Sequence, residues 1–448
     1  MNIVIVGGGE LGSMVAKQLV AENHNLTIIE KSENQAKFLN DSLDAHIING
    51  NGNDVSRLLQ ANIEKADLFL ALSNNDDVNI ICCALVKKHS KATTIAKVEN
   101  YVHYFPGPPN LPSDFGIDET VATKQLSINK IMELISEPDA MEHIHYIREN
   151  VKVIGTVIKD NFYGNGMKLK DITSKNDIWQ KVRIIAINKQ NEVMIPGGED
   201  FLNTGDKLYI IGKSNILKDV INLYFATKVK IKSVIIVGGN RIGKEFAKRA
   251  VAEGRRVTII EEDEKVCERL TEELDNVLIV NGSGTNQEIL SDLDMEKSFV
   301  ACVTENDEHN IISAVLAKKN HAYKAVCNIS NVAISSIINE VRDIDSVFST
   351  ESLAFAEIIR FCRKGDILSV TPVPYIDAET IKIKVSKKIP LLNKPLSKIK
   401  FPKGMIVGAI FRDDNVIIPY GDDEIKLNDI IILFVLPESK KQAEKMFA

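Results

Sequence analysis

The sequence predicts an α/β protein with two Rossmann-like doubly wound parallel sheets, each followed by a small α+β domain. Three observations lead to this prediction. A glycine-rich turn joins a strand to a helix at the start of the chain, the same unit returns 231 positions later, and each copy is followed by short strands and turns. A long internal repeat of this kind indicates duplicated domains.

The first copy opens with the β-branched run Ile3 to Val6, which is typical of a buried parallel strand. Residues 7–12 follow with the sequence GGGELG, a G-x-G-x-x-G pattern, and a helical pattern comes next. The first glycine permits a tight turn, the second lets a pyrophosphate approach the backbone, and the third lets helix and strand pack closely. Glu30 ends the second strand, 18 positions after Gly12, where an acid can bind the adenosine ribose hydroxyls. These features predict a dinucleotide site.

Each copy is expected to contain five strands that alternate with four helices. In the first copy the strands are expected near 2–6, 26–30, 45–48, 67–72 and 93–98, with helices that begin near Leu11, Glu33, Asp54 and Asp77. This alternation is typical of a parallel sheet with its ligand at the carboxyl ends of the strands. Glu30, residues 51–53, Ser73 and Asn74 follow such ends, so they are expected to meet at the edge that carries the glycine turn.

The second copy repeats these landmarks. Residues 234–243 read VIIVGGNRIG, and a helix leads from them to Thr258–Glu261, TIIE. Asn49–Gly52 is matched by Asn281–Gly284, and the SNNDDVN segment at 73–79 by TENDEHN at 304–310.

The segments that leave each sheet differ between the copies. Residues 101–117 contain Pro106, Gly107, Pro108, Pro109 and Pro112, so we expect an exposed loop rather than a helix, whose purpose is unexplained. The matching segment 331–348 has no proline and could be helical. Amphipathic helices are expected over 120–136 and 351–364. Each either crosses to a partner chain or covers its own sheet.

Between 151 and 224 the pattern changes to short antiparallel strands and turns, and this module returns near 407–433. The predicted units are a nucleotide-binding domain at 1–118, a linker helix at 119–140 and a small domain at 141–226, then the same three units at 232–349, 350–367 and 368–448.

Composition excludes several classes of protein. The net charge of −6 argues against a nucleic-acid surface. The six cysteines lack CxxC spacing, which indicates free thiols in a reducing cytosol. No export signal and no apolar run of about 18 residues is visible, so a cytoplasmic protein is expected.

These motifs, in this duplicated order, resemble the TrkA family. The marks are the GGGELG half, the GNGND turn, the SNNDDVN strand end and a small module with the pattern P-x-G-x-x-x-L-x-x-G-D. TrkA proteins are cytosolic regulatory subunits of bacterial and archaeal Trk and Ktr potassium uptake systems, built from RCK N-terminal (TrkA-N) and C-terminal (TrkA-C) domains. The resemblance covers essentially the whole chain.

The resemblance implies a peripheral protein on the cytoplasmic face of the plasma (inner) membrane. It would gate a separate, membrane-embedded potassium-translocating subunit of the TrkH, TrkG or KtrB kind. It also implies that the chain binds NAD+ or NADH, that ATP or ADP competes, and that four copies form a homotetrameric ring. No covalent catalysis and no metal site are expected.

The resemblance also assigns site residues. In the first copy they are Gly7, Gly8, Gly9, Glu10, Leu11, Gly12, Glu30, Gly52, Asn53, Ser73, Asn74 and Lys97. In the second copy they are Gly238, Gly239, Asn240, Arg241, Ile242, Gly243, Glu261, Gly284, Thr304 and Glu305. Asn240 replaces the middle glycine, and its Cβ narrows the approach to a pyrophosphate. Three interpretations of the second copy stay open: an occupied dinucleotide site, a mononucleotide site, or a pseudo-site kept for packing and symmetry.

Two other functions fit parts of the sequence. An NAD-dependent oxidoreductase would need an acid/base group beside the nicotinamide, and of the eight histidines only His309 lies near a strand end. A transcriptional regulator would need a basic recognition helix, and the basic runs are too short. Glu30 argues against NADP, because a 2′-phosphate would be repelled. Binding of NAD(H) without turnover separates a regulator from an enzyme.

Overall fold

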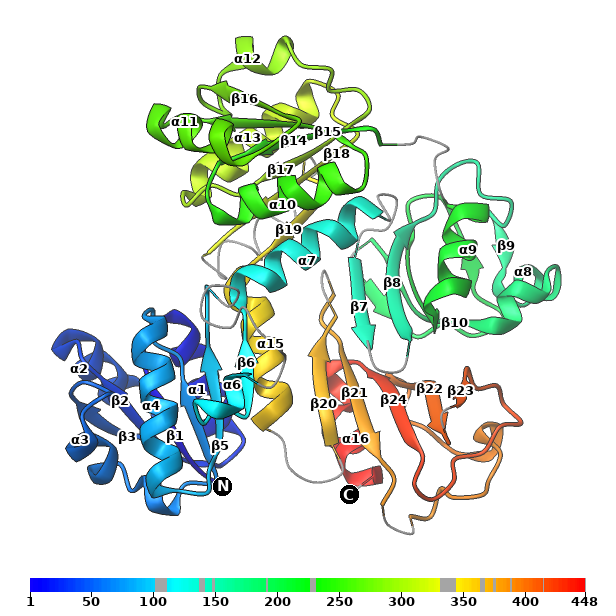
Figure 1. Ribbon diagram of the computed structural model, residues 1–448. Helices are drawn as coiled ribbons and strands as arrows, with labels where there is room; N and C mark the ends of the chain where they lie inside the picture. Colours follow the sequence, from blue (N-terminus) through cyan, green and yellow to red (C-terminus); the bar gives the residue numbers. More distant parts are fainter. Residues whose placement is uncertain are drawn as a thin grey trace.

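The computed structural model describes residues 1–100, 111–136, 142–146, 150–190, 192–225, 231–330, 344–362, 367–373, 376–386, 389–413 and 415–447. It contains two parallel six-stranded sheets and two antiparallel five-stranded sheets, arranged as two halves that interlock (Figure 1). This architecture confirms the predicted fold class. None of the helices in the described ranges is long and apolar enough to cross a membrane.

The first half is built on a parallel sheet with strand order β3-β2-β1-β4-β5-β6. Its elements are β1 (Asn2–Val6), α1 (Glu10–Ala21), β2 (Asn25–Glu30), α2 (Glu33–Ser42), β3 (His46–Asn49), α3 (Val55–Gln60), β4 (Leu68–Ala71), α4 (Asp76–His89), β5 (Thr93–Lys97) and β6 (Glu119–Val121). Ile3 and Ile5 of β1 enter the core on one face, and Val4 and Val6 enter the core on the other. Burial on both faces explains why β1 is apolar without alternation.

The second half repeats this plan with strand order β16-β15-β14-β17-β18-β19. Its elements are β14 (Ser233–Val237), α10 (Arg241–Ala252), β15 (Arg256–Glu261), α11 (Glu264–Glu273), β16 (Val277–Asn281), α12 (Gln287–Ser291), β17 (Ser298–Cys302), α13 (Asp307–Lys319), β18 (Lys324–Asn328) and β19 (Ser346–Phe348). The predicted repeat is therefore a repeat of structure as well as of sequence.

Two expectations about the end of the first sheet were wrong. Residues 119–121 form a sixth strand, β6, so the helix expected from 120 begins only at Thr123. Residues 111–114, expected as loop, form the short helix α6 (Leu111–Asp114). A proline is tolerated in the first turn of a helix, which explains Pro112 there. Residues 101–110, and with them most of the proline-rich loop, lie outside the described residues, as do 331–343 of the segment expected to be helical.

The helices that follow the sheets are exchanged between the halves. Helix α7 (Thr123–Ser136) leaves the first sheet and packs on α10 of the second half, where Ile131 and Leu134 enter the core around Phe246. Helix α15 (Thr350–Cys362) leaves the second sheet and packs on α1, where Ile358 joins the core of the first half (Figure 1). Each helix thus covers the sheet of the other copy within one chain. We had expected each helix to cross to a partner chain or to cover its own sheet, and neither expectation included this arrangement.

The two small modules are antiparallel sheets with orders β11-β10-β13-β8-β7 and β20-β21-β24-β22-β23. The first contains β7 (Glu142–Tyr146), β8 (Val151–Val157), β9 (Met167–Lys168), α8 (Leu169–Ser174), β10 (Val182–Lys189), β11 (Glu192–Met194), β12 (Phe201–Leu202), β13 (Lys207–Lys213) and α9 (Ser214–Tyr224). The second contains β20 (Ile367–Pro372), β21 (Glu379–Lys384), β22 (Met405–Arg412), β23 (Asn415–Ile417), β24 (Ile430–Val435) and α16 (Lys440–Phe447).

The modules pack against each other through one shared core. Ile185 and Ile211 of the first module meet Ile432 and Phe434 of the second in this core. At its rim Arg183 donates to the carbonyl oxygen of Pro419 at 3.0 Å. The two modules are therefore a second place, after the exchanged helices, where the halves are joined.

The exchange of α7 predicts an effect in the half that does not contain the mutation. Ile131 is fully buried in the core of the second half, so Ile131→Ala should destabilise its packing by about 2–5 kcal/mol. Hydrogen exchange followed by mass spectrometry should show that the substitution speeds exchange, relative to the wild type, more in β14 and β15 than in β1 and β2. Ser136→Ala, at an exposed position of the same helix, is the control. Faster hydrogen exchange confined to the first half would contradict the packing of α7 on the second half.

Candidate functional site

A glycine elbow at residues 7–12 joins β1 to α1 at the carboxyl edge of the first sheet. Gly7 has φ +96°, and a Cβ there would lie 2.7 Å from the Ser73 nitrogen. A Cβ at Gly12 would lie 2.0 Å from the Gly7 oxygen. Both positions therefore require glycine. Gly9 differs, because a Cβ built on it would meet no described atom within 4 Å.

The start of α1 is open in this elbow. Gly9 is the N-cap residue, and it has no side chain with which to cap the helix. The first N–H groups of a helix have no partner within the helix, and they attract anions. An uncapped N-terminus beside open space at Gly9 is therefore suited to a phosphate group.

Glu30 is hydrogen-bonded to the elbow itself. One carboxylate oxygen accepts from the Gly8 N–H at 2.6 Å, and the other accepts from the Ser32 N–H at 2.8 Å. The side chain is only 8% exposed. Each carboxylate oxygen can accept a second hydrogen bond, so Glu30 can hold the elbow and still accept from a hydroxyl group.

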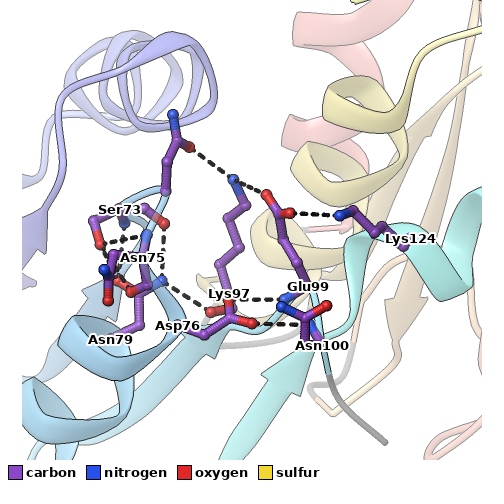
Figure 2. Close-up of polar contacts among 9 residues, drawn as sticks. Ser73, Asn75, Asp76, Asn79, Lys97, Glu99, Asn100 and Lys124 are labelled. Carbon is purple, nitrogen blue, oxygen red and sulfur yellow. Dashed lines mark hydrogen bonds and ion pairs between the residues drawn. The ribbon is translucent and has the colours of Figure 1, made fainter. Parts of the chain in front are cut away.

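Asn79 connects two strand ends at this edge of the sheet, although it was not among the site residues predicted from the sequence. Its Oδ1 accepts from the backbone N–H and the hydroxyl of Ser73 at 3.0 and 2.7 Å. Its Nδ2 donates to the carbonyl oxygens of Ser73 and Lys97, both at 2.9 Å (Figure 2). Asn79 thus ties the end of β4 to the end of β5. Asn79 is the last residue of the SNNDDVN motif, and this position could have identified it from the sequence.

Lys97 brings a positive charge to this edge. Its Nζ donates to Asn74 Oδ1 at 2.9 Å and lies 3.4 Å from Glu99 Oε1, while Lys124 Nζ lies 3.0 Å from Glu99 Oε2 (Figure 2). Burial opposes ionisation of Glu99, but hydrogen bonds and charge from Lys124 and Lys97 prevail, and the pKa of Glu99 is lowered. Lys124 belongs to α7, so this chain of charges links the edge of the first sheet to the exchanged helix.

The second half also reaches this edge. Asp76 accepts from the Asn100 N–H at 2.8 Å, and Asn100 in turn accepts a hydrogen bond from Arg241, the first residue of α10. Glu351, near the start of α15, has its pKa raised by burial and secondarily by the carboxylate of Glu10. The first site is therefore bordered by residues of both halves.

The second glycine elbow, residues 238–243, has the same backbone but a different start to its helix. Gly238 has φ +109°, and the Gly239 N–H donates to Glu261 at 2.6 Å. Asn240 caps α10: its Oδ1 accepts from the N–H groups of Ile242 and Gly243 at 3.0 and 3.1 Å.

The other predicted residues fall into groups. Leu11 and Ile242 are buried in the cores, and glycine is needed at 52 and 284 because a Cβ would lie 2.2 Å from Val6 and Val237 respectively. Asn53, Asn74 and Glu305 are exposed, and Glu10 is exposed at the start of α1. Thr304 is held by Asn310 as Ser73 is held by Asn79, with both contacts to Asn310 Oδ1 at 2.8 Å.

Comparison with known families identifies this arrangement. Residues 3–122 and 234–350 match the TrkA-N domain, and residues 165–224 and 381–448 match the TrkA-C domain. The chain belongs to the TrkA family. The predicted resemblance is confirmed over both halves.

Similar proteins carry the same family name over their full length. A Trk system potassium uptake protein TrkA homolog from Archaeoglobus fulgidus is 29% identical, with 100% of both chains covered. TrkA homolog 2 from Methanosarcina mazei is 28% identical, also with 100% of both covered. TrkA from Halomonas elongata is 26% identical over 100% of this chain and 98% of its own.

Solved structures share the fold of this TrkA-family chain. The crystal structure of the GsuK RCK domain has a TM-score of 0.60 and 16% identity, covering 100% of this chain and 94% of that one. The GsuK channel bound to NAD has the same TM-score and identity, covering 100% and 78%. Because the sequences are only 16% identical, this similarity establishes the fold alone.

The charges around Glu99 predict an acid-sensitive contribution to stability. Because the folded-state pKa of Glu99 lies below its ordinary value of 4.5, its contribution is present above that value and is lost as the pH falls through the folded pKa. Glu99→Gln should therefore melt at a lower temperature than the wild type at pH 7. The difference should shrink below about pH 4.5. Glu296→Gln, at an exposed position, is the control. A pH-independent difference in melting temperature would contradict this account.

Proposed function

We propose that this chain is the nucleotide-binding regulatory subunit of a Trk potassium uptake system, with NAD+ or NADH bound by the first half and ATP or ADP as competing ligands. The observation that carries the proposal is the start of α1, where Gly9 leaves space beside the N–H groups of Leu11 and Gly12 and Glu30 accepts from the Gly8 N–H. The names of the relatives support the link to potassium uptake.

The residues of the first edge fit a dinucleotide. The N–H groups at the start of α1 would hold the pyrophosphate, and Glu30 would accept from the adenosine ribose. Ser73, Asn74 and Lys97 would face the other half of the ligand. A dinucleotide bound here adds negative charge close to Lys97, which would compete with Glu99 for that ammonium group.

In this proposal residues 1–118 form the sensing domain, residues 232–349 form the corresponding domain of the second half, and the modules at 141–226 and 368–448 transmit their movement. A ligand shifts the assembly only by its difference in affinity for the two conformations. A shift from mostly closed to mostly open needs about 5.5 kcal/mol, so four chains in a homotetramer would each supply roughly 1.4 kcal/mol. One charge-assisted hydrogen bond per chain is of this size.

The proposed partner is a membrane-embedded potassium-translocating subunit of the TrkH, TrkG or KtrB kind. The regulatory ring would dock on it at the cytoplasmic face of the plasma (inner) membrane. The chain is regulatory rather than enzymatic, as its named relatives are potassium uptake proteins. His309, the histidine nearest a strand end, is half-exposed, and its Nδ1 lies 3.6 Å from Glu262 Oε1 in the second half.

Calorimetric titration of NADH, NAD+, ATP and ADP tests the proposal. At least one ligand should bind with a Kd of roughly micromolar order, and Glu30→Ala should weaken it at least about tenfold, the equivalent of about 1.4 kcal/mol. Glu261→Ala is a matched control, because Glu261 makes the same contact to its own elbow at 2.6 Å. It should leave the affinity unchanged.

Two results would overturn the proposal. One is equal binding by the wild type and Glu30→Ala, which would place the ligand elsewhere. The other is an absence of binding by all four nucleotides. Reduction of a carbonyl compound by NADH, or oxidation of a hydroxy acid by NAD+, would instead support the oxidoreductase alternative.

A further inference from the structure

The two glycine elbows have nearly identical backbones. Gly9 and Asn240, the N-cap residues, have φ −64° and −65° with ψ −163° and −178°. Gly8 and Gly239 each donate to a glutamate at 2.6 Å. The elbows therefore differ in their side chains rather than in their path, and the main difference is the side chain at the cap.

The Asn240 side chain occupies the position that an anion takes at a helix N-terminus. Its Oδ1 accepts from the second and third N–H groups of α10, those of Ile242 and Gly243. Its Nδ2 donates to the carbonyl oxygen of Val303, at the end of β17, at 2.5 Å. The amide is thus held from both sides, and it satisfies donors that a pyrophosphate would need.

Two other residues at the second edge also make hydrogen bonds within the chain. Arg241, the first residue of α10, donates to Asn100 of the first half. Asn328 stands where the first half has Lys97, and its Oδ1 accepts from Thr350 at 3.2 Å. At this position the second edge therefore has an amide in place of the buried ammonium group of Lys97, and Arg241 binds the other half of the chain.

We infer that the Asn240 side chain replaces a bound phosphate, so that the chain takes one dinucleotide, in its first half, and the second half serves as a ligand-free support. This inference rests on the proposed function, which supplies the ligand. To admit a pyrophosphate, Asn240 would have to leave both N–H groups. Loss of such a cap reduces affinity between about two- and thirty-fold before any steric effect.

The number of sites per chain, measured by calorimetric titration of NADH onto the full chain, tests this inference. The wild type should bind one equivalent. Asn240→Gly should add a second, weaker class of sites, because it frees the start of α10. Gly9→Asn should weaken binding in the first half by at least about two- to thirty-fold.

Gly9→Asn also separates capping from misfolding. The backbone at Gly9 suits any L-residue, and a Cβ there has open space, so the asparagine can cap α1. The variant should melt at the wild-type temperature or above it, while NADH should raise its melting temperature less than that of the wild type. Gly9→Ala, which adds a Cβ without an amide, is the matched control and should bind NADH more tightly than Gly9→Asn.

Each contrary result has a distinct meaning. Two equivalents bound by the wild type would overturn the inference and leave the proposed function standing. One equivalent bound by Asn240→Gly would show that another feature closes the second elbow, which also overturns the inference. Absence of binding by the wild type would overturn the proposed function itself.

Discussion

The exchange of α7 and α15 is the constraint on which the rest of this structure depends. Each helix buries its apolar face in the core of the other half, and the two helices touch where Ser127 and Thr350 share a hydrogen bond of 2.7 Å. Because part of one face of each sheet is covered by the helix of the other half, the halves are not packed as independent domains. A change at one carboxyl edge must either be absorbed locally or turn the two halves about this crossing.

Polar contacts connect the first edge to the crossing. Lys97 binds Glu99, and Glu99 binds Lys124 in the first turns of α7. A second route runs from Asp76 through Asn100 to Arg241 at the start of α10. A ligand that takes Lys97 from Glu99 therefore acts on a group that also holds the exchanged helix. The elbow of the second half is capped by Asn240, so a ligand at the first edge acts on one half of a joined pair.

Local patterns predicted most of this fold. The β-branched strands, the glycine spacing and the acid at Glu30 can each be recognised in a short stretch of chain. The internal repeat showed that these elements belong to two copies of one domain. The sixth strands were missed because three residues, such as Glu119–Val121, are too few to show a period. The exchange of helices depends on contacts between residues over 100 positions apart, which periodicity does not encode. The cap by Asn240 could have been predicted, because asparagine is among the best N-cap residues.

The central claim is that a ligand at the first elbow moves the two halves relative to each other. Spin labels at Lys37→Cys in α2 and Glu268→Cys in α11, both at exposed positions, report the distance between the two halves by pulsed electron–electron double resonance. The six native cysteines are buried, so the labels are directed to the two introduced thiols. NADH should shift the distance distribution, and Glu99→Gln should reduce the shift while NADH still binds. An unchanged distribution at saturating NADH would contradict the account.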